Sequence, residues 1–234
     1  VPVWGEIGIT ARRLLDELGD AGHTVDQRPE LAERWAIWRE EKASRLDDDR
    51  GEGINSATVF AALTETVPHD AIIAVDVGNN TYSFGRYFEC AGQRVLMSGY
   101  LGSIGFSFPA AMGAWAATQD QEAYRGRKVI SISGDGGFGQ YLADFTTAVK
   151  YEMDITHVLL NNAQLGKISK EQRAGEWPVW QTSLHNPSFA AYAKLCGAKG
   201  VRVTDAARLP DALMAAIRHE GPALVEIVTD AELI

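Results

Sequence analysis

The chain has 234 residues, of which 46% are hydrophobic and 23% charged, and its formal net charge is -9. This length suits one large domain, or a domain plus a fragment, with a sizeable buried core. The acidic balance argues against nucleic acid as a partner, because proteins that bind phosphate backbones usually present a basic face.

The cysteine content and the hydropathy pattern indicate the cellular environment in which we expect the protein. Cys90 and Cys196 are too few for a disulfide framework and lack the spacing of zinc ligands, so we expect core thiols in a reducing compartment. No apolar run approaches the roughly 20 residues that a membrane-spanning helix needs, and the amino end lacks a signal-peptide pattern. We therefore expect no membrane segment and a soluble, cytoplasmic protein.

The first 53 residues differ in character from the rest. Residues 1–4 are β-prone, and apolar residues follow at helical spacing up to Leu18. We interpret residues 1–20 as the remnant of a preceding middle domain, since the chain starts without methionine as a longer polypeptide cut at this point would. Residues 21–53, with a helix expected from Pro29 and a run of charges before Gly53, predict a charged helical connector.

From residue 54 to 234, apolar strands alternate with amphipathic helices. Strands are expected over residues 71–76, 94–98, 128–133, 155–161, 198–203 and 223–228. Helices are expected over residues 56–67, 106–118, 138–151, 187–196 and 207–219, the first with Ser56 as its N-cap. This alternation predicts an α/β fold, a doubly wound parallel sheet with helices on both faces. Ligands of such sheets bind at the carboxyl ends of the strands.

A glycine-rich loop at residues 134–139 directly follows one expected strand. Its sequence, Gly-Asp-Gly-Gly-Phe-Gly, matches the G-x-G-x-x-G pattern of NAD-dependent dehydrogenases, with Glu152 or Asp154 as the possible ribose-binding acid. However, the carboxylate of Asp135 would repel a directly bound pyrophosphate unless a cation lay between them. The loop therefore predicts a metal ion.

A second group of candidate ligands stands at the end of the next strand, where residues 155–160 lead into Asn161 and Asn162. Carboxylate, amide oxygen, backbone carbonyl, water and phosphate oxygens together form the hard octahedral set that suits Mg²⁺. We expect Mg²⁺ to bridge Asp135 and a diphosphate.

The spacing of these two groups is similar to a known motif. Gly-Asp-Gly at 134–136, followed by residues 137–160 and then Asn-Asn at 161–162, resembles the thiamine-diphosphate motif of the decarboxylases, acetohydroxyacid synthases and pyruvate oxidases. The resemblance implies thiamine diphosphate and Mg²⁺ as cofactors. It implies three metal ligands, namely Asp135, Asn162 and the backbone carbonyl of Gln164.

Two further segments extend the resemblance over about residues 53–230. Residues 76–80 are similar to the loop of the family that helps to hold the diphosphate, although Asp76 by itself is more simply a helix N-cap. Residues 99–113 are similar to the turn beneath the thiazolium, where Ile104 would prop the cofactor in a bent shape and the carbonyl of Gly102 would accept a hydrogen bond from its amino group. The implied cofactor-binding residues are Val77, Gly78, Asn79, Asn80, Gly102, Ile104, Gly134, Asp135, Gly136, Gly137, Asn162, Gln164, Leu165 and Gly166.

The segment at 161–172 is similar to pyruvate oxidases, including an acid at Glu171 where acetohydroxyacid synthases typically place tryptophan. Glu171 would join Gly102 and Ile104 as a catalytic residue, and its alternative is a solvated helix charge. The resemblance implies decarboxylation of a 2-oxo acid such as pyruvate, followed by oxidation of the enamine, with FAD possible in the full-length enzyme. The alternatives are acetohydroxyacid synthase-like carboligation and a non-catalytic domain that retains the fold.

The resemblance also implies protein partners. In that family, a glutamate on the pyrimidine-binding domain of a neighbouring subunit activates the cofactor, so we expect a homodimer or homotetramer at full length and an inactive chain in isolation. The alternative is an enzyme whose pyrimidine domain is a separate chain. His157, inside an expected strand, has no metal-ligand spacing and receives no role.

Overall fold

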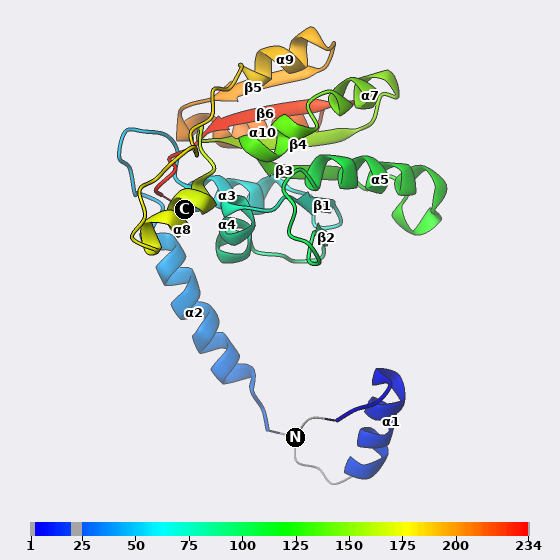
Figure 1. Cartoon of the computed structure of the whole chain (residues 1–234). Coiled ribbons are helices and arrows are strands. Elements are labelled where there is room, and N and C mark those ends of the chain that lie inside the picture. The colour runs from blue at the N-terminus through cyan, green and yellow to red at the C-terminus, as the bar shows by residue number, and fades with distance from the viewer. Residues whose placement is uncertain (1–2, 20–24, 234) are drawn as a thin grey trace. The chain divides into compact units, whose positions relative to one another are not determined.

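A computed structural model describes residues 3–19 and 25–233, and the chain divides into two compact units, Val1–Glu40 and Glu41–Ile234 (Figure 1). The first unit contains α1 (Ile7–Leu18), which begins where the Glu6 carboxylate accepts hydrogen bonds from the backbone of the first turn. α2 (Arg28–Ser44) contains the boundary between the units. Of the strand expected at 1–4, residues 1 and 2 lie outside the described residues, and Val3 and Trp4 are not in a strand.

The second unit is built on one six-stranded sheet. Its strands are β1 (Ile72–Val75), β2 (Arg94–Met97), β3 (Val129–Gly134), β4 (Ile155–Asn161), β5 (Lys199–Val203) and β6 (Ala223–Val228). They lie in the order β2-β1-β3-β4-β6-β5, and every neighbouring pair is parallel. The predicted doubly wound α/β fold is thereby confirmed.

Helices connect the strands. They are α3 (Ser56–Thr66), α4 (Asn79–Tyr87), α5 (Ser107–Asp120), α6 (Asp135–Gln140), α7 (Asp144–Lys150), α8 (Gly166–Ala174), α9 (Phe189–Leu195) and α10 (Leu209–Ile217), with 3₁₀ turns η1 (Glu122–Tyr124) and η2 (Ala206–Arg208). The prediction of a single helix over 138–151 was wrong, because the structure has two helices there. The first begins at Asp135, and residues 141–143 separate it from the second. The N-cap of α3 is Asn55, whose side chain accepts from the backbone of Thr58, and not Ser56.

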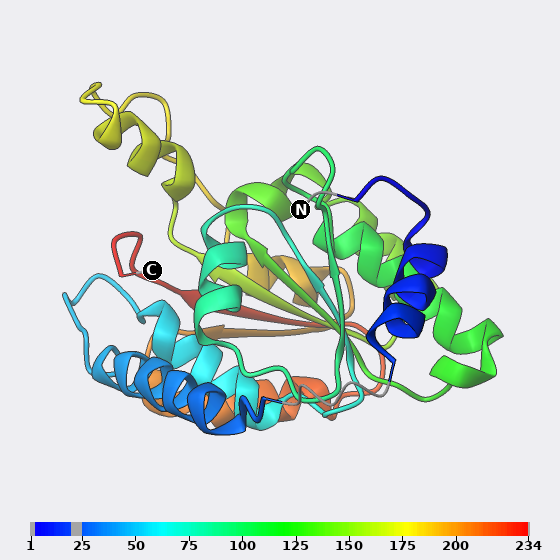
Figure 2. The same cartoon turned by 90° about the horizontal axis from the view of Figure 1, so that it is seen from below.

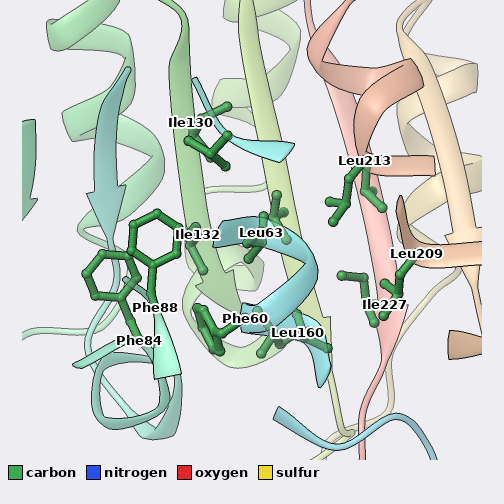
Figure 3. Close-up of a cluster of buried hydrophobic side chains, with 14 of the residues drawn as sticks. Phe60, Leu63, Phe84, Phe88, Ile130, Ile132, Leu160, Leu209, Leu213 and Ile227 are labelled. Atoms are coloured by element: carbon green, nitrogen blue, oxygen red, sulfur yellow. The ribbon is translucent and has the colours of Figure 1, made fainter. Parts of the chain in front are cut away.

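Successive strand residues face opposite sides of the sheet and supply two separate cores. On one face, Ile130 and Ile132 of β3 belong to one buried cluster with Phe60 of α3 and Phe84 of α4 (Figure 3). On the other face, Phe108 of α5 packs with aromatic residues of α6 and α7, and the aromatic residue of α6 packs in turn with one of α9. Figure 2 shows α3 and α10 on one side of the strands and α5 on the other. Both faces are therefore covered, and the edge at the carboxyl ends of the strands is left for a ligand.

Two expectations about environment can be compared with this fold. The prediction of two core thiols was wrong for Cys90, which is exposed in the connection between α4 and β2, while Cys196 is half-buried after α9. No helix among the described residues is long and apolar enough to cross a membrane.

Candidate functional site

A cavity of about 290 Å³ opens at the carboxyl edge of the sheet. Its walls come from the segments that follow β1, β2, β3, β4 and β6, so five strand ends converge on it. Every residue of the expected cofactor-binding set lines this cavity: Val77, Gly78, Asn79, Asn80, Gly102, Ile104, Gly134, Asp135, Gly136, Gly137, Asn162, Gln164, Leu165 and Gly166. The structure brings these residues together, and what they bind stays a prediction.

The cavity is also lined by six residues that the sequence analysis did not assign to the site: Ser56, Leu160, Lys167, Ile168, Thr229 and Asp230. Thr229 and Asp230 directly follow β6, which is adjacent to β4 in the sheet. In the sequence they are a pair of polar residues after an apolar strand. Such a pair points to this site only once β6 is known to lie beside β4.

Asp135 is almost completely buried at the start of α6. Its Oδ2 accepts a hydrogen bond from Asn186 Nδ2 at 2.6 Å, and its Oδ1 accepts from the backbone nitrogen of Gly136 at 3.0 Å. Burial raises the pKa of Asp135, and these hydrogen bonds oppose the rise. Within the described ranges no lysine or arginine pairs with it. A buried carboxylate without a protein cation suits a metal ion, because an isolated buried charge is costly.

The turn after β4 has an unusual backbone. Asn162 Oδ1 accepts from the backbone nitrogen of Gln164 at 3.0 Å, and Ala163 between them has a φ of 54°. For a residue with a side chain this left-handed conformation is uncommon and costs about 1 kcal/mol or more, so the surroundings must enforce it. Gln164 pairs with Ser183, which belongs to the segment that returns past the turn. The amide of Asn162 is therefore held at the cavity wall by its own turn.

Asp76 connects two walls of the cavity. Its buried carboxylate accepts from the backbone nitrogens of Val77 at 2.7 Å, Gly105 at 2.8 Å and Phe106 at 3.1 Å. Burial raises the pKa of Asp76, and the three backbone donors oppose the rise. The expectation that Asp76 is an N-cap was wrong, since Gly78 stands before α4 and the acid instead holds the turn that contains Ile104.

Two glycines let backbone segments approach closely at the cavity. A Cβ on Gly137 would lie 2.4 Å from Asp76 Oδ2 and 3.2 Å from the nitrogen of Gly105. A Cβ on Gly136 would lie 2.7 Å from a methyl carbon of Leu165. Side chains at these positions would therefore collide with the segments that follow β1, β2 and β4.

The residues present fit a diphosphate held through Mg²⁺. Asn79 Nδ2 is buried and has no hydrogen-bond partner among the residues that the structure describes, which leaves a donor for a phosphate oxygen at the cavity wall. Asp135 and Asn162 supply hard oxygen atoms, the ligand type that Mg²⁺ prefers. No cluster of three histidine, cysteine, aspartate or glutamate side chains able to hold a metal occurs in the part of the chain described, but the expected set contains one carboxylate and does not need such a cluster.

Glu171 is not among the residues that line the cavity. It lies on α8, and its carboxylate pairs at 2.5 Å with Lys167, which does line the cavity. The pair is solvent-exposed, as expected of a helix charge, so the structure brings Glu171 near the site only through Lys167.

The dinucleotide alternative does not fit the geometry. Glu152 and Asp154 precede β4 at the amino edge of the sheet, and Asp154 pairs with Lys128 just before β3. A six-residue strand such as β3 separates this edge from the loop at 134–139 by about 20 Å. Neither acid can therefore serve a nucleotide bound at that loop, so the dinucleotide alternative lacks the ribose-binding acid that it requires.

Comparisons with known proteins agree with the site. The family model "Thiamine pyrophosphate enzyme, C-terminal TPP binding domain" matches residues 76–227. "Putative thiamine pyrophosphate-containing protein YdaP" of Bacillus subtilis is 37% identical over 175 residues, which cover 74% of this chain and 29% of that protein. The mitochondrial acetolactate synthase catalytic subunit of Aspergillus candidus is 31% identical, over 98% of this chain and 33% of its own length.

A solved structure is also similar. The thiamine diphosphate-dependent 4-hydroxybenzoylformate decarboxylase of Rhodococcus jostii RHA1 has a TM-score of 0.65 and 26% identity, over 78% of this chain and 34% of that chain. The chain thus spans about a third of the length of these relatives. With the family model matching well over half of its residues, the chain belongs to the thiamine pyrophosphate enzymes and contains their C-terminal, cofactor-binding domain.

Proposed function

We propose that this chain is the diphosphate-holding part of an enzyme that uses thiamine diphosphate and Mg²⁺ to decarboxylate a 2-oxo acid such as pyruvate. The observation that carries the proposal is the buried Asp135 carboxylate, which lines one cavity with the Asn162 amide and has no cation of the described protein beside it. The proposal includes a pyrimidine-binding domain from a neighbouring subunit, because the chain corresponds to only about a third of its relatives.

Each wall of the cavity has a part in this proposal. Asp135, Asn162 and the carbonyl of Gln164 would hold Mg²⁺, while the amide of Asn79 and the backbone of Gly136 and Gly137 would face the diphosphate. Ile104 would support the bent cofactor, and the Gly102 carbonyl would accept a hydrogen bond from its amino group. When bound, thiamine diphosphate would supply a nucleophilic carbon for the carbonyl group of the 2-oxo acid and a thiazolium ring that accepts the electron pair released with carbon dioxide.

Two candidates differ in what happens to the fragment left after carbon dioxide is lost. The segment at 161–172, with Glu171, supports oxidation, for which FAD in the full-length protein would be the acceptor. The names of several relatives, including acetolactate synthases of Aspergillus candidus and Bacillus subtilis, support transfer to a second carbonyl compound. With pyruvate as substrate, acetate or acetyl phosphate would identify oxidation, and acetolactate would identify carboligation.

The experiment that tests the metal site is calorimetric titration of thiamine diphosphate into the complete gene product that contains this chain. We expect binding that depends on Mg²⁺, is reversed by EDTA and is abolished in Asp135→Ala, because the diphosphate then loses its bridging cation. The control is Asp120→Ala, which removes an exposed acid outside the cavity and is expected to bind as the wild type does. Unchanged affinity in Asp135→Ala would refute the assignment.

A further inference from the structure

Asn186 lies in the connection before α9, outside every motif of the sequence, yet it contacts the central acid of the site. Its Nδ2 donates to Asp135 Oδ2 at 2.6 Å and to Asn161 Oδ1 at 3.0 Å. Both hydrogens of one amide group are used, so the orientation of Asn186 is fixed by two acceptors at once. One of these acceptors is the Asp135 carboxylate, whose other oxygen accepts from the backbone nitrogen of Gly136.

Asn161 is held in turn by a buried acid. Its Nδ2 donates at 2.9 Å to Glu226 Oε1, and the Glu226 side chain is completely buried in β6. Glu226 also accepts from the backbone nitrogen of Ala190 at 2.9 Å and pairs with Arg202 of β5 at 2.5 Å. The order β4-β6-β5 places these side chains on three adjacent strands. Rigid, hydrogen-bonded strands therefore carry the far end of the network.

The Glu226 side chain is completely buried while the Arg202 side chain is 45% exposed, and an ion pair that places a charge in the interior contributes little net stability. The donors around Glu226 satisfy its carboxylate fully, so the group is well accommodated in the sheet. Its hydrogen bond to Asn161 connects it, through Asn186, to Asp135. This arrangement suits a role in orientation more than a role in stability.

The segment that presents Asn186 also holds the other expected metal ligands. Leu184 donates its backbone N–H to the carbonyl of Ala163 at 2.8 Å, and Leu165 donates to the carbonyl of Thr182 at 2.7 Å. These bonds lie on both sides of Gln164, whose carbonyl is the third expected ligand. One returning segment, residues 182–186, thus contacts both the acid and the turn that would bind the metal.

We propose that Asn186 and Glu226 are positioning residues for the metal site. Glu226 fixes the orientation of Asn161, which together with Asp135 fixes the orientation of Asn186. Asn186 in turn sets the rotation of the Asp135 carboxylate. The inference rests on the proposed function, because it assigns the two residues to the same Mg²⁺ site. Hydrogen-bonding partners outside the ligand set of a metal typically change its affinity by about 10- to 100-fold when they are removed.

The test uses Mn²⁺ in place of Mg²⁺ with the complete gene product and thiamine diphosphate, because free Mn²⁺ is counted directly by electron paramagnetic resonance. Asn186→Ala is expected to raise the dissociation constant of Mn²⁺ about 10-fold or more. Glu226→Gln keeps the shape and is expected to raise it by a smaller factor. Since Glu226 acts through Asn186, the double variant is expected to bind no more weakly than Asn186→Ala alone. At saturating Mn²⁺ the affinity for thiamine diphosphate should return to the wild-type value.

The matched control is Thr156→Val, which removes a buried side-chain hydrogen bond to the carbonyl of Ala216 at the opposite end of β4. It is expected to lower thermal stability and leave Mn²⁺ binding unchanged. The inference is overturned if Asn186→Ala binds Mn²⁺ within twofold of the wild type, or if Thr156→Val weakens binding as much. Asn186 lies in a partly exposed connection, so folding is expected to survive its truncation. If the wild type itself binds no divalent cation with thiamine diphosphate, the proposed function fails and the inference fails with it.

Discussion

The carboxylate of Asp76 lies 2.8 Å from the backbone nitrogen of Gly105, 29 positions later in the chain. The acid at the end of β1 therefore determines where the turn with Ile104 lies, although it is not itself among the residues that line the cavity. Any change that releases this bond is expected to act on the turn first.

Asp76→Ala is expected to lower the free energy of unfolding by about 3 kcal/mol, because buried backbone donors would lose their acceptor. Asp76→Asn should cost less, since its amide oxygen can still accept. Urea unfolding measures both, with Asp70→Ala as the control on an exposed acid just before β1. Equal effects of Asp76→Ala and Asp70→Ala would contradict the role of this carboxylate.

Gly137→Ala is expected to lower the free energy of unfolding by about 1–3 kcal/mol, since the new methyl group would lie 2.4 Å from Asp76 Oδ2. The affinity for thiamine diphosphate should fall as well. Gly139→Ala, in the same helix, meets nothing within 4 Å and is expected to leave stability unchanged or to raise it by up to about 1 kcal/mol. Chemical unfolding and calorimetric titration of the two variants provide the comparison. Wild-type stability and affinity in Gly137→Ala would show that the segments with Asp76 and Gly105 can move away from the new methyl group.

Ile104→Ala is expected to lower turnover more than cofactor affinity in the complete gene product, because the diphosphate anchor remains while the support of the bent cofactor is lost. A displacement of about 1 Å at a reacting centre can cost on the order of 100-fold in rate. Ile104→Leu keeps the bulk and should retain most of the activity. Leu101→Ala changes an exposed residue of the same turn and should have little effect. Steady-state kinetics measures the turnover and calorimetric titration the cofactor affinity of each variant. Equal losses of turnover and affinity in Ile104→Ala would argue against the role of Ile104.

His157 predicts a specific pH dependence of stability. Burial lowers the pKa of His157 from 6.5 to about 3, and its ring nitrogens contact the hydroxyls of Ser131 and Ser133. The unfolded chain binds the proton more tightly than the folded chain, so the contribution of this group is complete above pH 6.5 and falls as the pH drops toward 3. The expected loss between pH 6.5 and 5 is about 2 kcal/mol.

The measurement is urea unfolding of wild type and His157→Gln at pH 7, 6 and 5. Asp76 and Asp135 titrate in both proteins, so the difference between the two curves isolates the histidine. The wild type should lose more stability than the variant as the pH falls. Parallel curves would show that the ring is protonated in the folded state or reaches solvent.

The strands and the main loops of the site were predictable because each depends on local sequence. The apolar runs of β3 and β4 end in polar ligands, and the parallel register places Gly134 beside Leu160, so the loop at 134–137 and Asn162 had to lie close together. Neither Asn186 nor Glu226 could be found this way. Asn186 reaches Asp135 only because the chain returns after α8, and Glu226 is one polar residue in an apolar strand.

The helices that prediction missed have a similar explanation. α4 begins Asn-Asn-Thr and contains a glycine, a composition of low helix propensity, and it is stabilised by Phe84 and Tyr87 in the core. α8 has few buried residues, so its sequence carries little apolar periodicity. In α4 tertiary packing therefore outweighs a weak local preference, whereas α8 lacks the apolar face that would have identified it.

The antiparallel bridge between Gln164 and Ser183 brings together the two ends of an excursion that carries α8 and the exposed Trp177 and Trp180. Loops whose ends are closed at their base tolerate replacement, because the scaffold does not depend on their contents. We therefore expect exchange of this stretch between members of the family to leave Asp135 and Asn162 in place, while it replaces the part of the cavity wall formed by residues 165–168. Grafting experiments that aim to change which molecule the cofactor reacts with should cut the chain at this bridge.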